Sequence, residues 1–326
     1  MLLAVLAVVI GLILLVWSAD KFVDGAASTA YRLGMSPLLV GMVIVGFGTS
    51  APEIVVSAFA SAQGNPGLAL GNAIGSNISN IALILGVTAL ICPIVVHSSI
   101  VKREIPILIG VSAVLWFLAA NQMLELLDGI ILLVLFAGIM GWSIYTATKK
   151  KEDPLSDEFD ESLDVPKKSL RYGIIWLIVG FIFLVISSRM LVWGAVSIAI
   201  ALGVSDLIVG LTVVAIGTSL PELASSIAAT RKGEHDIALG NVVGSNLFNT
   251  LGVVGLAAVI KPFEIESIAL TRDFPVMSGL TLLLFLLCFG FKGQGKIKHW
   301  EGGLLTATYI GYTILVVVAA IQHAGA

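Results

Sequence analysis

Long apolar stretches, separated by short polar turns, occupy almost the whole chain. Several exceed the roughly 18 apolar residues that a helix needs to cross a bilayer, and they lack the polar–apolar alternation of membrane β-strands. The pattern therefore predicts an all-α polytopic membrane protein with ten transmembrane helices. Their approximate ranges are 2–24, 36–62, 68–92, 102–120, 125–147, 170–196, 205–230, 237–260, 272–290 and 300–321.

The two halves of this pattern are copies of each other. When each residue from Gly11 to Pro106 is compared with the residue 169 positions later, about 40 of the 96 positions are identical. The chain is therefore expected to contain two five-helix repeats, 1–147 and 170–326, joined by a charged linker at 148–169. Because five is odd, the second copy must enter the membrane in the opposite direction. Such an inverted repeat is typical of transporters.

Composition and charge support a membrane location and predict an orientation. The chain is 58% hydrophobic and only 12% charged, which is too apolar for a soluble domain. If both termini lie outside, 15 of the 18 Lys and Arg residues fall in cytoplasmic loops, as expected of such loops. We therefore expect a prokaryotic plasma (inner) membrane protein with both termini outside. The two cysteines, Cys92 and Cys288, lie in apolar contexts and favour buried packing over a disulfide.

Two polar motifs interrupt the apolar stretches, and each occurs once per half. The first, Gly-Thr-Ser-x-Pro-Glu, occupies 48–53 and 217–222, and the second, Gly-Asn-x-x-Gly-Ser-Asn-x-x-Asn, occupies 71–80 and 240–249. Ionisable residues within a membrane span are costly and usually functional. The centres of these helices contain no Lys or Arg to pair with the glutamates. The motifs therefore predict one functional site built from both halves.

The residue types in these motifs indicate the class of ligand. Thr49 and Glu53 are four residues apart and share a helix face, while Pro52 crowds the carbonyl of Gly48 and frees backbone oxygens at mid-membrane depth. The motifs thus offer carboxylate, hydroxyl, amide and carbonyl oxygens but neither His nor Cys. All-oxygen sets suit hard cations, and Ca²⁺ and Na⁺ lose water more readily than Mg²⁺. Two glutamates can be neutralised by one Ca²⁺ or by two monovalent ions, which is a requirement for exchange.

The paired motifs, the two five-helix halves and the polar central loop resemble the sodium/calcium exchanger family, especially its short prokaryotic members. The resemblance implies a ten-helix fold with four ion sites between helices 2, 3, 7 and 8, and alternating access by sliding of helices 1 and 6. It also implies a set of ion ligands. Matched residue by residue, these are Thr49, Ser50, Glu53, Ser76, Asn80, Thr218, Ser219, Glu222, Ser245 and Asn249, with backbone carbonyls at Gly46 and Ala215.

One position departs from the family pattern. Well-studied members carry an aspartate where this chain has Asn249, so the predicted site lacks a third carboxylate. The family's stoichiometry of three sodium ions therefore does not transfer directly. Two Na⁺, two H⁺ or K⁺ per Ca²⁺ all remain open.

The resulting hypothesis is a secondary active antiporter that exchanges Ca²⁺ for Na⁺ by alternating access, in the direction of Ca²⁺ efflux. The alternative is a Ca²⁺/H⁺ or K⁺-coupled antiporter. A cation channel is a remote alternative, because the chain has no evident ring of identical filter loops. An enzyme is not expected, because Ser50 and Ser219 have no intramembrane His or Lys as a base. We expect Ca²⁺, a monovalent cation and membrane lipid as partners, no cofactor, no nucleic acid and a functional monomer.

Overall fold

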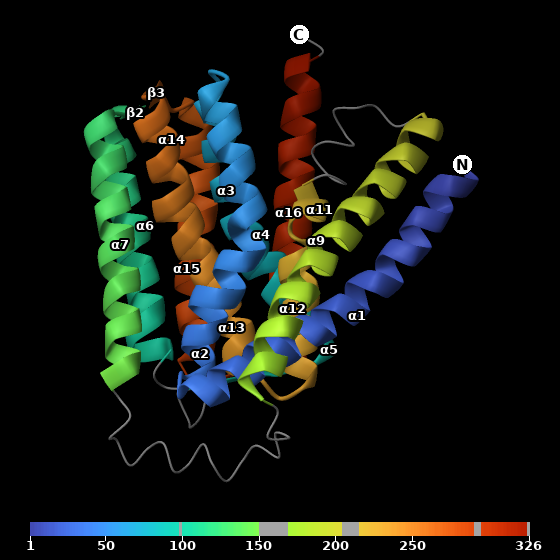
Figure 1. The fold of residues 1–326 in the computed structure, drawn as a ribbon. Helices are drawn as coiled ribbons and strands as arrows, with labels where there is room; N and C mark the ends of the chain where they lie inside the picture. The colour runs from blue at the N-terminus through green and yellow to red at the C-terminus, as the bar shows by residue number, and fades with distance from the viewer. Residues whose placement is uncertain (98–99, 150–168, 204–214, 290–294, 325–326) are drawn as a thin grey trace.

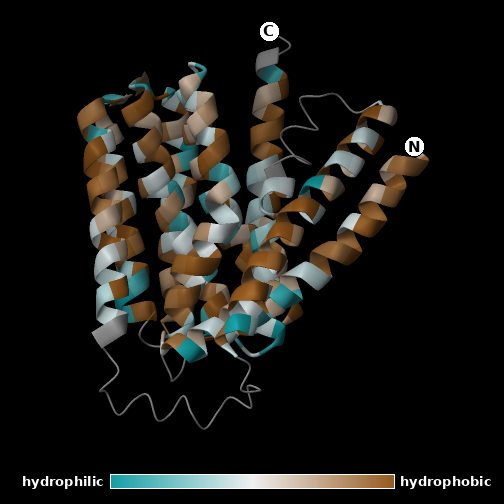
Figure 2. Cartoon of the chain, viewed as in Figure 1, coloured by the Kyte–Doolittle hydropathy of each residue, from teal (hydrophilic) through white to brown (hydrophobic). Residues whose placement is uncertain are grey.

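The computed structural model describes residues 1–97, 100–149, 169–203, 215–289 and 295–324. Within these ranges nine helices are long and apolar enough to span a membrane. Figure 1 shows them as a bundle of long helices, and apolar residues cover most of their length in Figure 2. The expected all-α polytopic membrane fold is therefore confirmed. The predicted seventh segment, 205–230, lies partly outside the described residues.

Each half consists of long helices interrupted by short π-helical segments. The helices of the first half are α1 (Leu2–Leu33), α2 (Pro37–Leu39), α3 (Gly46–Ala62), α4 (Pro66–Ser79), α5 (Gly86–Ile91), α6 (Ile105–Leu118) and α7 (Leu126–Lys149). The helices of the second half are α9 (Leu170–Ala201), α11 (Ala215–Thr218), α12 (Leu220–Arg231), α13 (His235–Leu247), α14 (Val254–Ile260), α15 (Phe274–Cys288) and α16 (His299–Ala324).

π-Helical segments occur inside membrane spans or at their start, and each continues directly into an α-helix. They are η1 (Val40–Val45), η2 (Asn80–Leu85), η3 (Ile100–Glu104), η8 (Phe248–Val253) and η9 (Ala269–Asp273), and a 3₁₀ turn, η4, spans Ala119–Asn121. The segments η2 and η8 begin where the second polar motif ends in each half. π-Helical turns frequently occur at functional sites, because they widen the helix locally.

Two short antiparallel ribbons join the halves. Strand β1 (Ile94–Val96) pairs with β4 (Gly295–Ile297), and β2 (Met123–Leu124) pairs with β3 (Phe263–Glu264). In each ribbon one strand comes from the first half and the other from the second. The second ribbon lies at the end of the bundle where both chain termini are found (Figure 1).

The helices α1 and α9 form an inclined pair beside the rest of the bundle (Figure 1). Each contains 32 residues, about 48 Å of helix, so each must tilt to fit a hydrocarbon layer of about 30 Å. Both are longer than the sequence predicted. Helix α1 continues past Asp20 and Asp24 to Leu33 and ends at Gly34, whose φ of 64° forms a left-handed cap.

Glycines allow the backbones of α1 and α9 to approach closely. A Cβ atom at Gly25 would clash with the Leu177 backbone nitrogen, and one at Gly180 would lie 2.6 Å from the backbone nitrogen of Phe22. Small residues at such crossings are typical of tightly packed membrane helices. The contacts run in opposite directions along the two helices, so the pair is antiparallel.

The second polar motif of each half lies in one of the two most buried spans that the described residues form. The span that contains α13 and η8 is 78% buried, and the span that contains α4 and η2 is 72% buried. The span that contains α1 is 33% buried, and that of α9 is 22% buried. The fold thus holds the second motif of each half at the centre of the bundle. Cys288 is buried and Cys92 is half-buried, and both are free thiols.

We expect a methyl group at Gly25 to force α1 and α9 apart. Overpacking of this kind typically costs about 1–3 kcal/mol, so Gly25→Ala should lower the thermal unfolding midpoint measured in detergent by tryptophan fluorescence. Gly110→Ala is a matched control, because Gly110 is exposed within α6 and no described atom lies within 4 Å of its added Cβ. Equal midpoints for the two variants would contradict the close helix contact.

Candidate cation site

The two copies of each polar motif meet at the centre of the bundle. They contribute side chains from α3, α4 and η2 in the first half, and from α12, α13 and η8 in the second. Hydrogen bonds in this region cross between the halves, among them Thr49 to Asn241 (3.1 Å), Ser79 to Ser219 (3.2 Å), Asn80 to Asn246 (2.9 Å) and Asn77 to Thr250 (2.8 Å). The structure thus brings the motif residues of both halves into one polar cluster.

Burial separates the predicted ligands into two groups. Nine of the ten predicted side-chain ligands are buried: Thr49, Ser50, Glu53, Ser76, Asn80, Ser219, Glu222, Ser245 and Asn249. Thr218 is exposed, unlike its repeat counterpart Thr49. Gly46 is buried, and its carbonyl oxygen accepts weak hydrogen bonds from Thr49 (3.4 Å) and Ser245 (3.5 Å). The backbone of Ala215 begins α11.

Several buried oxygens in this cluster have no hydrogen-bond partner among the residues that the structure describes. They are Ser50 Oγ, Glu53 Oε2, Asn77 Oδ1, Glu222 Oε2 and Asn249 Oδ1. Buried polar atoms are nearly always paired in folded proteins, so such a group of acceptors needs an explanation. A cation bound among them would satisfy several acceptors together.

Burial of the two glutamates is the largest electrostatic cost in the cluster. Glu53 is 4% exposed and Glu222 is 2% exposed, and their negative charges repel each other. A buried charge without a partner costs several kcal/mol. A positive ion between the helices would offset both the desolvation and the repulsion.

The donor set fits a hard cation. Within the described ranges no three His, Cys, Asp or Glu side chains gather as a metal cluster, so the two carboxylates need hydroxyl, amide or carbonyl oxygens to complete a coordination shell. Ca²⁺ takes six to eight such oxygens in a flexible arrangement. The unpaired oxygens of Ser50 and Asn249 are of the required type.

The first polar motif has a different backbone in each half, although the sequence predicts the same device twice. Pro52 lies inside the continuous helix α3. In the second half the helix breaks at Ser219, and Pro221 occupies the first turn of α12, where proline causes no loss of a helical hydrogen bond. The sequence repeat could not predict this difference, because equivalent residues of the two halves can have different backbone conformations in the same structure.

Sequence reasoning assigned no role to Asn241 or Thr250, which the structure places in the cluster. The amide nitrogen of Asn241 approaches Ser225 Oγ (3.2 Å) and Ser226 Oγ (3.0 Å). Its place within the repeated Gly-Asn pair was a signal that could have identified it. Thr250 has no such signal, because its repeat counterpart is Ile81.

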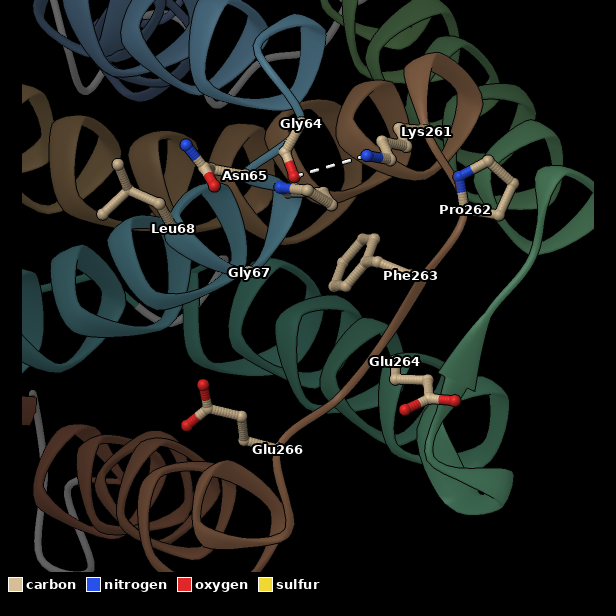
Figure 3. Close-up of a pocket in the computed structure, with 10 residues that line it drawn as sticks. Gly64, Asn65, Gly67, Leu68, Lys261, Pro262, Phe263, Glu264 and Glu266 are labelled. Atoms are coloured by element: carbon tan, nitrogen blue, oxygen red, sulfur yellow. Dashed lines mark hydrogen bonds between the residues drawn. The ribbon is translucent and has the colours of Figure 1, made fainter.

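The surface hollow in Figure 3 is separate from this cluster. It lies between the turn that joins α3 to α4 and the segment that follows α14, and Lys261 Nζ donates to the Gly64 carbonyl oxygen across it (3.4 Å). Glu264 and Glu266 also line the hollow, but the predicted ion ligands do not. It is a surface depression and not the candidate site.

Comparisons of the sequence with a protein-family profile and with known proteins agree with one another. The protein-family profile described as "Sodium/calcium exchanger protein" matches residues 3–145 and 172–318. The chain is 45% identical to "Putative antiporter CaxA" of Alkalimonas amylolytica, over 97% of this chain and 99% of that protein. It is 41% identical to "Inner membrane protein YrbG" of Escherichia coli, over 95% of both proteins.

Two further matches are an exchanger sequence and a solved exchanger structure. The chain is 31% identical to "Sodium/calcium exchanger MaX1" of Methanosarcina acetivorans, over 95% of this chain and 97% of that protein. A solved structure of the sodium-calcium exchanger NCX_Mj, soaked with zero Na⁺ and Ca²⁺, matches with a TM-score of 0.82 and 33% identity. The match covers 95% of this chain and 98% of that one.

We expect Ca²⁺ to stabilise the protein through the two glutamates. Ligand at a hundred times its dissociation constant contributes about 2.7 kcal/mol, so Ca²⁺ should raise the unfolding midpoint of the wild type in detergent. Glu53→Gln and Glu222→Gln should lose this increase. At a pH high enough to ionise both carboxylates in the absence of Ca²⁺, each variant should be more stable than the wild type, because one of two repelling buried charges is gone. Glu125→Gln, at an exposed residue, is the control, and an equal Ca²⁺ effect on Glu53→Gln would refute the site.

Proposed function

The chain belongs to the sodium/calcium exchanger protein family, and on that basis we propose that it exchanges Ca²⁺ for Na⁺ by alternating access. Cation/Ca²⁺ exchange is the activity of this family of antiporters, and the protein is a multi-pass membrane protein. The choice of Na⁺ and the direction of Ca²⁺ efflux are our proposal. An inward Na⁺ gradient would drive the exchange.

The observation that carries this proposal is the pair of buried glutamates, each with one unpaired carboxylate oxygen. With their combined charge of −2, the empty site is costly in a low-dielectric interior. One Ca²⁺ or two Na⁺ would restore neutrality. If the site must be neutral before it can change the side of the membrane to which it is open, it must carry either Ca²⁺ or Na⁺ at each change. The movement of one ion is then coupled to that of the other.

The ligands that we propose are the residues implied by the family resemblance. Glu53 and Glu222 supply the charge, while the hydroxyl and amide side chains and the carbonyls of Gly46 and Ala215 complete the shells. Asn249 contributes an oxygen without a charge, and its Oδ1 atom is one of the unpaired acceptors. Substrate ions are the only bound species in this proposal; it includes no cofactor, no catalysed reaction and no nucleic acid.

A Ca²⁺/H⁺ exchanger is the second candidate, and the same site gives it a specific basis. Asn249 cannot be protonated, so the two glutamates are the acidic side chains assigned to the site, and two protons would replace one Ca²⁺ without net charge movement. A K⁺-coupled exchanger would use the same oxygens. Na⁺ remains the favoured ion, because the neutral hydroxyl and amide oxygens can coordinate it but cannot bind an additional proton at neutral pH.

The proposed orientation places both termini outside a prokaryotic inner membrane. In Figure 1 the two termini lie at one end of the bundle, and α7 ends at the opposite end. The excess of Lys and Arg in the loops assigned to the latter end supports a cytoplasmic location. We further propose two inverted repeats, 1–147 and 170–326, a tether at 148–169, and a monomer in lipid as the transport unit.

Transport in proteoliposomes tests the proposal. An outward Na⁺ gradient should drive uptake of radioactive Ca²⁺, whereas a pH gradient alone or no gradient should not. Glu53→Gln should abolish the uptake, because the site can then no longer neutralise Ca²⁺. Uptake driven by protons alone would reassign the protein as a Ca²⁺/H⁺ antiporter. No Ca²⁺ movement under any gradient would refute calcium exchange.

Restoring the third carboxylate tests the charge argument. We expect Asn249→Asp to strengthen Ca²⁺ binding and to raise the Hill coefficient for Na⁺ by about one, since an additional Na⁺ is needed to neutralise the site. Both quantities are measured from the concentration dependence of exchange. Asn249→Ser, which keeps an oxygen without adding charge, is the control. An unchanged Na⁺ dependence in Asn249→Asp would contradict the charge-balance mechanism.

A further inference from the structure

Asn77 is a buried amide on α4 that makes hydrogen bonds through its nitrogen only. It directly follows Ser76, one of the proposed ligands, and is 2% exposed. Its amide nitrogen donates to Thr250 Oγ1 (2.8 Å) and to Met277 Sδ (3.4 Å). Its Oδ1 atom has no hydrogen-bond partner among the described residues. Asn77 is not one of the ligands that the family resemblance implies.

The two contacts fix the orientation of this amide. A thioether sulfur can accept a hydrogen bond but cannot donate one, so the group that faces Met277 must be the NH₂ group and not the carbonyl oxygen. Met277 lies on α15 and Thr250 in η8, and both are 1% exposed. The carbonyl oxygen of Asn77 is therefore held on the edge of the amide away from these two residues.

The repeat identifies the donor that this oxygen lacks. The counterpart of Asn77 is Asn246, whose Oδ1 atom accepts a hydrogen bond from the amide of Asn80 (2.9 Å). The equivalent donor to Asn77 would be Asn249, but Asn77 Oδ1 receives no such bond, and Asn249 Oδ1 also has no partner among the described residues. Two amide oxygens thus occupy the positions equivalent to a hydrogen-bonded pair, and neither has a donor.

A cation satisfies these oxygens better than water does. A buried water bridges polar groups but has only two protons to donate, whereas five buried oxygens of the cluster lack a partner, two of them on Glu53 and Glu222. The glutamates also attract positive charge. Neutral carbonyl oxygens coordinate monovalent ions in channel filters, whereas Ca²⁺ binds more strongly as the ligands contribute more charge. A pair of amide oxygens therefore favours a monovalent cation.

We propose that Asn77 and Asn249 form a subsite for one monovalent cation, with their two amide oxygens as ligands. Thr250 and Met277 are positioning residues, which hold the NH₂ group of Asn77 and so keep its oxygen toward the ion. The subsite holds one of the two Na⁺ that replace Ca²⁺, while the second Na⁺ stays with the glutamates. This inference rests on the proposed function and adds to it a place where one Na⁺ is kept apart from the other.

Removing the hydroxyl group of Thr250 tests the orientation. Thr250→Val has nearly the same shape but offers Asn77 no hydroxyl acceptor, so the amide can reverse and turn its NH₂ group toward the ion. One hydrogen bond corresponds to up to about a tenfold change in an equilibrium. The Na⁺ concentration that displaces half of the bound radioactive Ca²⁺ from the purified full-length protein in detergent, divided by the Ca²⁺ dissociation constant without Na⁺, should therefore rise several-fold.

Two matched variants control this measurement. Thr250→Ser keeps the hydroxyl group and should restore the ratio of the wild type. Thr281 is also a buried threonine, but its hydroxyl donates to the Met277 carbonyl oxygen within its own helix (2.9 Å), so Thr281→Val should not raise the ratio. An equal ratio in Thr250→Val and Thr281→Val would overturn the proposal, since a merely structural threonine affects the binding of both ions alike.

A charge at position 77 separates a ligand from a structural residue. Asn77→Asp keeps an oxygen and adds a negative charge that a bound cation would neutralise. Na⁺ should therefore raise the unfolding midpoint of Asn77→Asp in detergent more than that of the wild type. An equal increase in the two proteins would show that the oxygen at this position meets water or protein instead of the ion. Thr250→Val keeps the test decisive if Asn77→Asp does not fold.

The inference and the proposed function can fail separately. If K⁺ but not Na⁺ displaces Ca²⁺ from the wild type, and Thr250→Val weakens this effect, the choice of Na⁺ is wrong and the subsite is supported. If Na⁺ displaces Ca²⁺ equally well from the wild type and from Thr250→Val, only the subsite is wrong. If neither ion displaces Ca²⁺, both are wrong. If the wild type binds no Ca²⁺, calcium exchange is wrong, and stabilisation of Asn77→Asp by Na⁺ still decides the subsite.

Discussion

The burial of two like charges in the middle of a membrane protein is the constraint on which the rest of the structure depends. Glu53 and Glu222 come from opposite halves and lie almost fully out of contact with solvent. Burial of such a pair is costly unless their charge is neutralised or compensated by surrounding groups. Helix α3 carries Glu53 beside Pro52, and a π-helical turn follows directly after α4 and after α13. The spans that contain α4 and α13 are the two most buried of those that the described residues form.

Much of this arrangement could be predicted from the sequence because membrane insertion limits the possible structures. Apolar length predicted the helices, and the paired motifs predicted the residues that gather at the centre. The length of α1 was underestimated, because Asp20 and Asp24 resemble a membrane boundary in a linear pattern. In the fold this part of α1 faces Lys232, which contacts Asp20 (2.8 Å) and Asp24 (2.6 Å). Paired charges of this kind can be accommodated within a long tilted helix.

The details of the site could be predicted less well, because a repeated sequence does not show how its two copies differ in the fold. Thr49 and Thr218 are equivalent in sequence but differ in exposure. Ser219 lies at a helix break, whereas Ser50 lies inside a helix. Asn241 was overlooked because it is adjacent to the glycine and outside the set of residues that the family resemblance assigns as ligands. Its contacts depend on the spatial convergence of α3, α12 and α13, which spacing along one chain does not reveal.

The two strand ribbons have a consequence for how a change in one half affects the other. Each ribbon takes one strand from the first half and one from the second. Within the described residues, neither half therefore completes these β-pairings on its own. The halves differ at many positions, as at Asp20 and its counterpart Arg189, but the ribbon strands remain paired across them. A substitution in a ribbon strand of one half must therefore fit the strand that the other half contributes.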